Sequence, residues 1–315
     1  MNKTFTRSFR KLCKDDVGIA GGKGASLGEM TQAGISVPPG FVLLAPVFDE
    51  FLKDTDLGVE IDSILHKVDH QKMHTVEHAS ETIQKLILEA KMPKDIMMAI
   101  RNEFKKLNTK YVAVRSSATA EDSSSAAWAG QLDTYLNTTE KNLVTNVQKC
   151  WASLFTPRAI FYRFEKNLHI QHISVAVVVQ KMIQSEKSGI AFSVHPVTTD
   201  KNQLIIEAVL GLGEAIVSGE VTPDSYVLSK IPRHIIDINV VPQNKGLFKG
   251  RNNRNEWKKL SKQSGEKQVL SDDEIFELSE LILTIEKHYS VPQDIEWAFE
   301  KKRFYIVQSR PITTL

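Results

Sequence analysis

The feature that most constrains the fold is a pair of strand-like segments near the C-terminal end of the chain. Between residues 294 and 311, two mainly apolar runs flank the charged sequence Glu-Lys-Lys-Arg, a pattern typical of a β-hairpin. Side chains two residues apart on a strand point to the same face of a sheet. The alternation therefore predicts that Asp294 and Glu296 share one face, and that Gln308 and Arg310 do the same on the second strand. Pairing of the two strands would bring two carboxylates, an amide and a guanidinium onto one surface.

This set of polar groups has two interpretations. Carboxylate and amide oxygens suit Mg²⁺, and a planar guanidinium suits a phosphate group, so the set is typical of a site for Mg²⁺ and a polyphosphate. The alternative is a half-buried hairpin with a solvated charged face, which needs no ligand. The hairpin pattern alone leaves both interpretations open.

Length, composition and charge exclude several classes of protein. The 315 residues are enough for one large or two ordinary domains, and a hydrophobic content of 42% with 25% charged residues is that of a globular protein. A net charge of +2 gives no electrostatic argument for a nucleic-acid partner. No apolar run approaches the roughly 18 residues of a membrane span, and no signal-peptide core is visible. We therefore expect a cytoplasmic protein with neither a nucleic-acid nor a membrane partner.

The order of the expected elements predicts an α+β protein. Helical periodicity dominates the first third of the chain, in the segments 25–33, 46–52, 59–68, 76–88 and 93–107. The second half is rich in strand-like runs, with one capped helix expected at 272–288. The polar segment 245–267 has no apolar periodicity and is predicted to be a surface insertion or loop. This order favours two lobes, roughly residues 1–170 and 171–315, with a cleft between them.

A glycine-rich segment near the N-terminal end is a candidate phosphate site. Gly21-Gly22-Lys23-Gly24 precedes a predicted helix, so its backbone can approach an anion and Lys23 can supply a positive charge. Its spacing differs from the P-loop pattern GxxxxGK[ST]. A glycine turn with a solvated lysine is an equally good interpretation.

A second candidate begins at Arg115, directly after the apolar strand 111–114. It is followed by a predicted loop rich in small hydroxyl residues, in which Ser116 and Thr119 are candidates for contacts with phosphate. The alternative is a flexible serine-rich surface loop. An unpaired arginine at a buried strand end is costly, which favours a functional role for Arg115.

Two further segments carry weaker signals. The glycine-rich sequence at 211–219 contains Glu214 and does not match the dinucleotide-binding fingerprint. The strand predicted at 175–183 contains Gln180, Lys181 and Met182, and its backbone groups are candidates for contacts with an adenine ring. From the residues alone, an ordinary core strand without a ligand is the preferred interpretation of this segment.

Four histidines recur at every fourth residue, at positions 66, 70, 74 and 78. On an unbroken helix, neighbouring pairs at this spacing can chelate a transition metal. The polar residues between them favour a solvated helix surface or a broken helix instead.

Eight sequence motifs, taken together, resemble a known family. In order they are GGKGASLGEM, VPPGF, VAVRSSATAED, WAGQLDTYLN, SLFTPRAIFYR, GLGEAIVSGEVTPD, DIEW and VQSRP. They resemble the N-terminal nucleotide-binding module of phosphoenolpyruvate synthase, which also occurs in pyruvate phosphate dikinase and rifampicin phosphotransferase. The resemblance covers residues 17–313. It implies a single module over residues 1–315 with a two-lobed ATP-grasp fold, in which ATP lies in the cleft between the lobes, and it implies ATP and Mg²⁺ as ligands.

The resemblance also implies roles for individual residues. The residues that it places around the nucleotide are Lys23, Arg115, Ser116, Thr119, Gln180, Lys181, Met182, Glu214, Asp294, Glu296, Gln308 and Arg310. Glu296 and Gln308 meet Mg²⁺ and the phosphates in this scheme, and Asp294 and Arg310 complete that shell. Glu214 lies near the ribose, and the strand around Gln180 flanks adenine. The catalytic contribution falls to Lys23, Arg115 and Arg310, because phosphoryl transfer needs positioning and charge neutralisation.

The implied activity is the ATP half-reaction of phosphoenolpyruvate synthase, in which a phosphoryl or pyrophosphoryl group passes to a histidine. Enzymes of this family continue beyond the VQSRP motif into a phosphohistidine domain and an acceptor domain, whereas this chain ends at Leu315. None of its nine histidines lies in the glycine-rich threonine-histidine motif that carries the phosphate. We therefore expect the accepting histidine on a separate carrier domain or chain.

Three other functions are compatible with parts of the pattern. The module can belong to an enzyme like rifampicin phosphotransferase, act as a non-catalytic ATP-binding regulator, or be a structural domain without a ligand. Retention of the charged residues argues against a degenerate regulator. The inward alternation of the hairpin residues argues against a purely structural domain.

Overall fold

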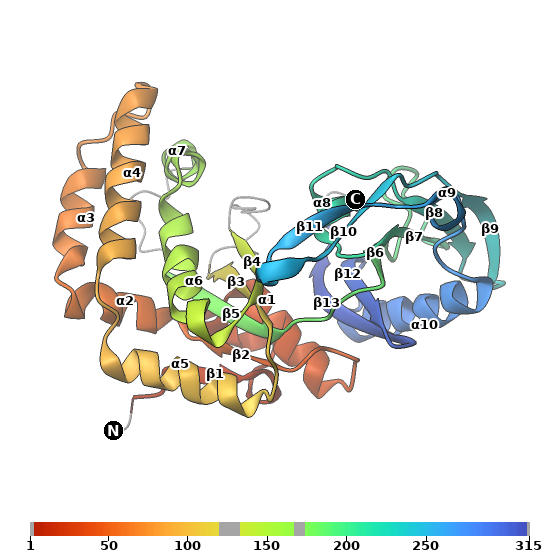
Figure 1. Ribbon diagram of the computed structural model, residues 1–315, viewed down its shortest axis with the longest axis horizontal. Helices are drawn as coiled ribbons and strands as arrows, with labels where there is room; N and C mark the ends of the chain where they lie inside the picture. The colour runs from red at the N-terminus through yellow and green to blue at the C-terminus, as the bar shows by residue number, and fades with distance from the viewer. Residues whose placement is uncertain (1–2, 120–132, 167–173, 314–315) are drawn as a thin grey trace. The chain divides into compact units, whose positions relative to one another are not determined.

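The computed structural model describes residues 3–119, 133–166 and 174–313 (Figure 1). The chain divides into two compact units. Unit 1 comprises Met1–Glu29 and Pro39–Met182, and unit 2 comprises Met30–Pro38 and Ile183–Leu315. Each unit combines helices with an antiparallel sheet, which confirms the predicted α+β class. Most of the predicted serine-rich loop, residues 120–132, lies outside the described residues.

Unit 1 is built on a five-stranded antiparallel sheet. Its strands, in spatial order, are β1 (Thr6–Ser8), β2 (Gly40–Leu43), β5 (Val175–Lys181), β3 (Val112–Ala118) and β4 (Thr134–Thr138). The described helices of this unit are η1 (Phe9–Lys11), η2 (Lys14–Asp16), α1 (Val17–Gln32, whose end enters unit 2), α2 (Ala45–Asp54), α3 (Leu57–Leu65), α4 (Met73–Glu89), α5 (Lys94–Lys106), α6 (Glu140–Ala152), η3 (Ser153–Phe155) and α7 (Pro157–Glu165). The helices predicted in the first third are therefore confirmed, with shifted ends.

The core of unit 1 follows from helical periodicity. On α4, the residues buried at intervals of three or four include Val76, Ile83 and Ile87, so one face of this helix packs against the rest of the unit. The rings of Phe51 and Trp151 lie 4.8 Å apart and join α2 to α6. Packing of this kind places the helices around β3 and β5, whose side chains are almost all buried.

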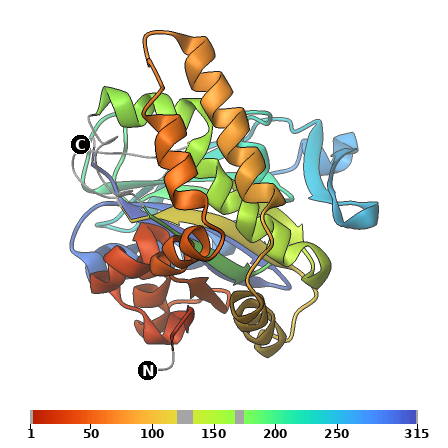
Figure 2. The same cartoon turned by 90° about the vertical axis from the view of Figure 1, so that its left-hand side faces the viewer.

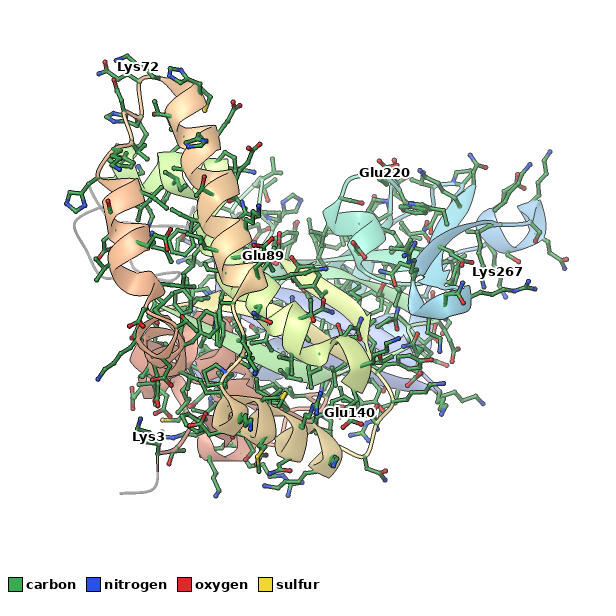
Figure 3. All side chains as sticks on the ribbon, turned by 60° about the vertical axis from the view of Figure 1, so that its left-hand side comes forward. Lys3, Lys72, Glu89, Glu140, Glu220 and Lys267 are labelled. Atoms are coloured by element: carbon green, nitrogen blue, oxygen red, sulfur yellow. The ribbon has the colours of Figure 1, made fainter. Side chains whose placement is uncertain are left out.

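The connection between α3 and α4 breaks the histidine pattern. Figure 2 shows these two helices side by side, and the segment 66–72 joins them, with Lys72 at the tip of the pair in Figure 3. His66 and His70 therefore lie outside the helices, whereas His74 and His78 lie on α4. The ring of His70 stacks on Phe164 at 5.3 Å. The interpretation as a broken helix is confirmed.

Unit 2 contains a six-stranded antiparallel sheet and a separate hairpin. The sheet strands, in spatial order, are β13 (Arg303–Pro311), β12 (Gln293–Glu300), β6 (Lys187–Phe192), β7 (Gln203–Leu210), β8 (Asp224–Ser229) and β9 (His234–Asn239). The separate hairpin pairs β10 (Lys245–Lys249) with β11 (Asn255–Lys259). The described helices are α8 (Glu214–Val217), η4 (Arg251–Asn253), α9 (Lys262–Gly265) and α10 (Asp272–Tyr289). Within the described ranges, no helix combines the length and the hydropathy that a membrane crossing requires.

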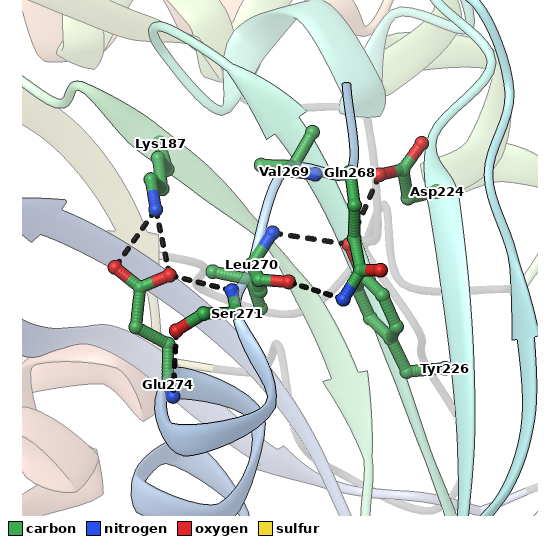
Figure 4. A network of polar contacts seen from close by, with 8 residues as sticks. All are labelled: Lys187, Asp224, Tyr226, Gln268, Val269, Leu270, Ser271 and Glu274. Atoms are coloured by element: carbon green, nitrogen blue, oxygen red, sulfur yellow. Dashed lines mark hydrogen bonds and ion pairs between the residues drawn. The ribbon is translucent and has the colours of Figure 1, made fainter. Parts of the chain in front are cut away.

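The start of α10 is held by a capping box, as the sequence predicts. Ser271 Oγ accepts a hydrogen bond from the backbone N–H of Glu274 at 3.3 Å, and the Glu274 carboxylate accepts one from the N–H of Ser271 at 2.8 Å. The same carboxylate also accepts a hydrogen bond from Lys187 Nζ at 2.7 Å (Figure 4). This contact links α10 to β6.

A buried carboxylate fixes the segment just before α10. Asp224 is fully buried and accepts hydrogen bonds from the Tyr226 hydroxyl at 3.0 Å and from the Val269 N–H at 2.8 Å (Figure 4). The Tyr226 hydroxyl in turn accepts from the Leu270 N–H at 3.1 Å. Burial raises the pKa of Tyr226, so the hydroxyl keeps its proton and remains a donor to Asp224. This network attaches Val269 and Leu270, which precede α10, to strand β8.

Two predictions about loops are wrong. Arg115 and Ser116 lie inside β3, which continues to Ala118, rather than in a loop that begins at Arg115. The polar segment 245–267, predicted as a surface insertion or a loop, is not a loop throughout, because it contains the β10–β11 hairpin (Figure 1). In both cases pairing with another strand imposes an extended backbone on residues whose polarity resembles that of a loop.

Candidate functional site

The C-terminal hairpin forms as predicted and brings its four polar residues together. In the antiparallel register of β12 and β13, Asp294 lies opposite Arg310, and Glu296 lies opposite Gln308. Directly opposed residues of an antiparallel pair project from the same face, with Cβ atoms about 5 Å apart. The register shifts immediately after Glu296, so that Val307 is an extra residue in β13. A bulge at this point bends the strand next to the polar group.

Asp294 and Arg310 form a close ion pair on this face. The Nε and one terminal nitrogen of Arg310 donate to the same oxygen of Asp294, at 2.8 and 2.7 Å. Burial raises the pKa of the Asp294 carboxyl above its ordinary value, Arg310 offsets part of this increase, and the negative charge of Glu296 adds to it. The two carboxylates therefore repel each other, and a cation between them would relieve that repulsion.

Glu296 and Gln308 fit the protein side of a magnesium site. They present a carboxylate and an amide oxygen as opposed neighbours, and both are hard ligands of the type that Mg²⁺ takes. In the described part of the chain, no group of three His, Cys, Asp or Glu side chains is placed to hold a metal ion. A site with few protein ligands suits Mg²⁺, which keeps several waters and binds through substrate phosphates.

The polar face continues across the sheet to a residue that the sequence reasoning missed. Glu296 lies opposite Ile190 on β6, and Ile190 lies opposite Glu207 on β7, so the three side chains form one row on the same face. Glu207 is half-buried. A sequence signal was present, because Glu207 is the only charged residue in the apolar run 204–210.

In unit 1, the glycine-rich segment is held against β3 by a serine that the sequence reasoning also missed. Gly21 interrupts α1 with φ +67° and ψ 168°, so a new helical segment begins just before Lys23. Ser117 Oγ donates to the carbonyl of Ala20 at 3.0 Å and accepts from the N–H of Gly24 at 3.3 Å. A Cβ at Gly21 would lie 2.2 Å from Ser117 Oγ, so no larger residue fits this position without a shift.

Arg115 and Gln180 lie on the same face of the unit 1 sheet as Ser117. Arg115 is opposite Val178 and Gln180 is opposite Ala113, so alternation along β3 and β5 points Arg115, Ser117 and Gln180 to one side. Arg115 is 9% exposed and Gln180 is 2% exposed. The Nε2 atom of Gln180 is buried and has no hydrogen-bond partner among the described residues. A buried donor of this kind would be satisfied by a ligand that offers an acceptor.

Four other residues of the sequence-based site are engaged by the protein itself. Ser116 projects to the face opposite Arg115 and donates to the carbonyl of Asp133 at 3.0 Å. Thr119 Oγ1 donates to the carbonyl of Ser174 at 3.1 Å. The backbone N–H of Lys181 donates to the carbonyl of Pro39 at 2.8 Å, and the backbone N–H of Met182 donates to the carbonyl of Tyr111 at 3.0 Å. These donors can reach a nucleotide only if they exchange their present partners.

Glu214 lies in the first turn of the short helix α8, next to the β10–β11 hairpin. Its carboxylate accepts a hydrogen bond from Asn255 Nδ2 at 2.7 Å. The preceding residues are attached to the same hairpin, since Leu212 N donates to Leu247 O at 2.8 Å. The hairpin therefore positions the glycine-rich segment 211–213 and the carboxylate that follows it.

The comparisons with known proteins identify the family. The family model described as the pyruvate phosphate dikinase AMP/ATP-binding domain matches residues 17–315, and the chain belongs to this family. It is thus an ATP-binding domain of the group that includes phosphoenolpyruvate synthases, as the sequence motifs indicate.

Curated relatives support this assignment. The probable phosphoenolpyruvate synthase of Methanocaldococcus jannaschii is 47% identical over 318 residues, which cover 99% of this chain and 27% of that protein. The probable phosphoenolpyruvate synthase of Methanothermobacter thermautotrophicus is 45% identical, with 99% and 46% covered. The phosphoenolpyruvate synthase of Pyrococcus furiosus is 39% identical, with 99% and 44% covered. The chain spans less than half the length of these relatives.

Proposed function

We propose that this chain is a MgATP-binding phosphotransferase module with an ATP-grasp fold. It passes a phosphoryl or pyrophosphoryl group from ATP to a histidine on a separate domain or chain, as in the first half-reaction of phosphoenolpyruvate synthase (pyruvate, water dikinase). The observation that carries this proposal is the register of the C-terminal hairpin. It places the Glu296–Gln308 pair directly beside the Asp294–Arg310 pair on one face.

The residues of unit 2 supply metal binding and charge neutralisation. Glu296 and Gln308 hold Mg²⁺, which when bound neutralises negative charge on the phosphate oxygens. Arg310 binds a phosphate with its planar guanidinium by exchanging or sharing its bonds to Asp294. Asp294 keeps Arg310 oriented until the nucleotide arrives.

The residues of unit 1 supply further positive charge and contacts to the base. Lys23, at the start of the helical segment after Gly21, and Arg115, on β3, bind phosphate oxygens. Gln180 offers its buried amide N–H to a ring nitrogen of adenine.

Transfer of a phosphoryl group and transfer of a pyrophosphoryl group each form one bond and break one bond. The imidazole nitrogen of the accepting histidine forms a bond to phosphorus, and the bond from that phosphorus to the bridging oxygen of ATP breaks. Attack at the γ-phosphorus releases ADP, and attack at the β-phosphorus releases AMP. The protein contributes positioning and electrostatic stabilisation, and no covalent intermediate on this chain is required.

The proposal is tested by calorimetry followed by a labelling assay. The wild-type chain is titrated with ATP in the presence and absence of Mg²⁺, and we expect binding that depends on Mg²⁺. It is then incubated with ATP labelled at the β- or γ-phosphate and with the remaining part of the Methanothermobacter thermautotrophicus phosphoenolpyruvate synthase as a separate chain. We expect acid-labile, base-stable label on a histidine of that chain.

The outcomes separate the alternatives. An absence of MgATP binding would overturn the proposed function entirely. Binding without any labelled histidine would favour a regulatory ATP-binding protein. Transfer of label to a small hydroxyl compound but not to histidine would favour an acceptor of the rifampicin type.

A further inference from the structure

Glu207 occupies a defined place relative to the magnesium-binding pair. It lies on β7, two strands from Glu296 in the order β12-β6-β7, and on the same face of the sheet. Adjacent strands are about 4.8 Å apart, so the backbones at Glu207 and Glu296 are separated by roughly 10 Å across the sheet. The side chain of Ile190 on β6 therefore lies between the two glutamates in this row.

The surroundings of Glu207 provide no partner for its charge. No hydrogen bond or ion pair reaches its carboxylate from the parts of the chain that the structure describes. Its neighbour toward Glu296 in the row is the half-buried Ile190, and its other cross-strand neighbour is Ser225. Burial raises the pKa of the Glu207 carboxyl, as expected for a carboxylate without a compensating cation. A ligand that brings hydrogen-bond donors would stabilise a half-buried carboxylate that has no such partner.

The chemistry of ATP restricts which of its parts can meet this carboxylate. A carboxylate only accepts hydrogen bonds, and the polyphosphate has no donors and would repel it. The donors of ATP are the amino group of adenine and the two hydroxyls of the ribose. The ribose lies between the base and the phosphates, so it is the donor-bearing part nearer to the magnesium-bound end of the nucleotide.

We propose that Glu207 binds the ribose hydroxyls of ATP, with its two carboxylate oxygens accepting from the 2′- and 3′-hydroxyls. This inference rests on the proposed binding of MgATP. It gives the β7 carboxylate the role of distinguishing ribonucleotides from deoxyribonucleotides. Glu214, which the family resemblance places near the ribose, is already hydrogen-bonded to Asn255.

The experiment compares three nucleotides on three forms of the full chain. Binding of ATP, 2′-deoxyATP and 3′-deoxyATP, each with Mg²⁺, is measured by calorimetry for the wild type, Glu207→Gln and Glu207→Ala. We expect the wild type to bind ATP about tenfold or more tightly than either deoxynucleotide, since a hydrogen bond to a charged group contributes at least that factor. Glu207→Ala should weaken ATP binding by more than this factor, because both hydrogen bonds to the ribose are lost, and should bring the three affinities within about twofold of each other. Glu207→Gln should lie between the two.

Controls separate a contact with the ribose from a structural effect. Glu277→Gln changes an exposed glutamate on α10 and should keep the preference for ATP. Thermal unfolding of the Glu207 variants should match the wild type, because this side chain has no partner in the described structure to lose. An unchanged preference for ATP in Glu207→Ala would overturn the inference while leaving the proposed function intact. So would loss of the preference in Glu214→Gln but not in Glu207→Ala. Failure of the wild type to bind MgATP would overturn both this inference and the proposed function.

Discussion

Polar side chains lie on sheet faces in both units, but the two regions hold them in different ways. On the β12–β13 hairpin, Arg310 is held by another side chain, the carboxylate of Asp294. On β3, Ser117 is held by backbone groups of Ala20 and Gly24. Ion pairs between side chains can exchange partners for a ligand, whereas bonds to the backbone fix a chain segment in place. Changes in the hairpin should therefore affect ligand binding, and changes around β3 should affect stability.

The largest effect is expected from Glu296→Ala. Removal of this carboxylate takes away the one charged ligand of the proposed magnesium pair, so phosphate transfer should fall by at least about a hundredfold. Arg310→Ala should produce a loss of the same order. The free energy of unfolding, measured in urea, should change by less than about 1 kcal/mol in Glu296→Ala. His70→Ala is the control and should transfer at the wild-type rate. Near-wild-type transfer in Glu296→Ala would remove the assignment of the metal ligand.

The next largest effect is expected from Gly21→Ala on stability. The new Cβ would lie 2.2 Å from Ser117 Oγ and 2.3 Å from its carbonyl oxygen, at a position with φ +67°. We expect a loss of about 3 kcal/mol or more in the free energy of unfolding. Gly18→Ala is the matched control, because a Cβ there meets nothing within 4 Å, and it should be neutral or slightly stabilising. Equal unfolding curves for the two variants would show that β3 does not fix the glycine-rich segment.

Ser117→Ala should have a smaller effect of the same kind. The substitution leaves the buried N–H of Gly24 without its acceptor, which costs roughly 1–3 kcal/mol in the free energy of unfolding. Ser116→Ala is the matched control. The Asp133 carbonyl that it releases still accepts the backbone N–H of Ser116 at 3.2 Å, so this variant should lose less stability. The prediction fails if Ser116→Ala is the more damaging of the two.

The smallest effect is expected from Glu274→Gln, and it should depend on pH. Burial alone would raise the pKa of Glu274, but Lys187 and the N–H of Ser271 outweigh burial and lower the pKa below its ordinary value. A carboxyl whose pKa is lowered by folding stabilises the protein above its unfolded pKa, and this stabilisation is lost as the pH falls through the folded pKa. Glu274→Gln should therefore cost about 1 kcal/mol at pH 7 and progressively less below about pH 4.3.

The same series with Glu277→Gln provides the comparison. Glu277 lies on the same helix and is exposed, so its loss should change stability by less than about 0.5 kcal/mol at pH 7. A difference between wild type and Glu274→Gln that persists unchanged at acid pH would exclude the ion pair with Lys187 as the cause.

Local patterns made the hairpin and the helices predictable. Alternation of polar and apolar residues placed Asp294 and Glu296 on one face, and the capping pattern at Ser271 marked the start of α10. Composition was misleading where polar residues lie in paired strands. Arg115 was placed in a loop because serine and threonine follow it, although all of β3 is buried. The β10–β11 hairpin was missed for a similar reason.

By itself, the sequence determined the class of fold, the family motifs and the shared face of the hairpin residues, because helical periodicity, strand alternation and turn chemistry depend on residues close together in the chain. Only the tertiary structure decided which distant segments become neighbours. The strand order β12-β6-β7 places Glu207 in the row of Glu296, and the contact of Ser117 with Ala20 and Gly24 places Lys23 beside β3. Such pairings are set by non-local hydrogen bonds and packing, and the pattern within one segment carries no information about them.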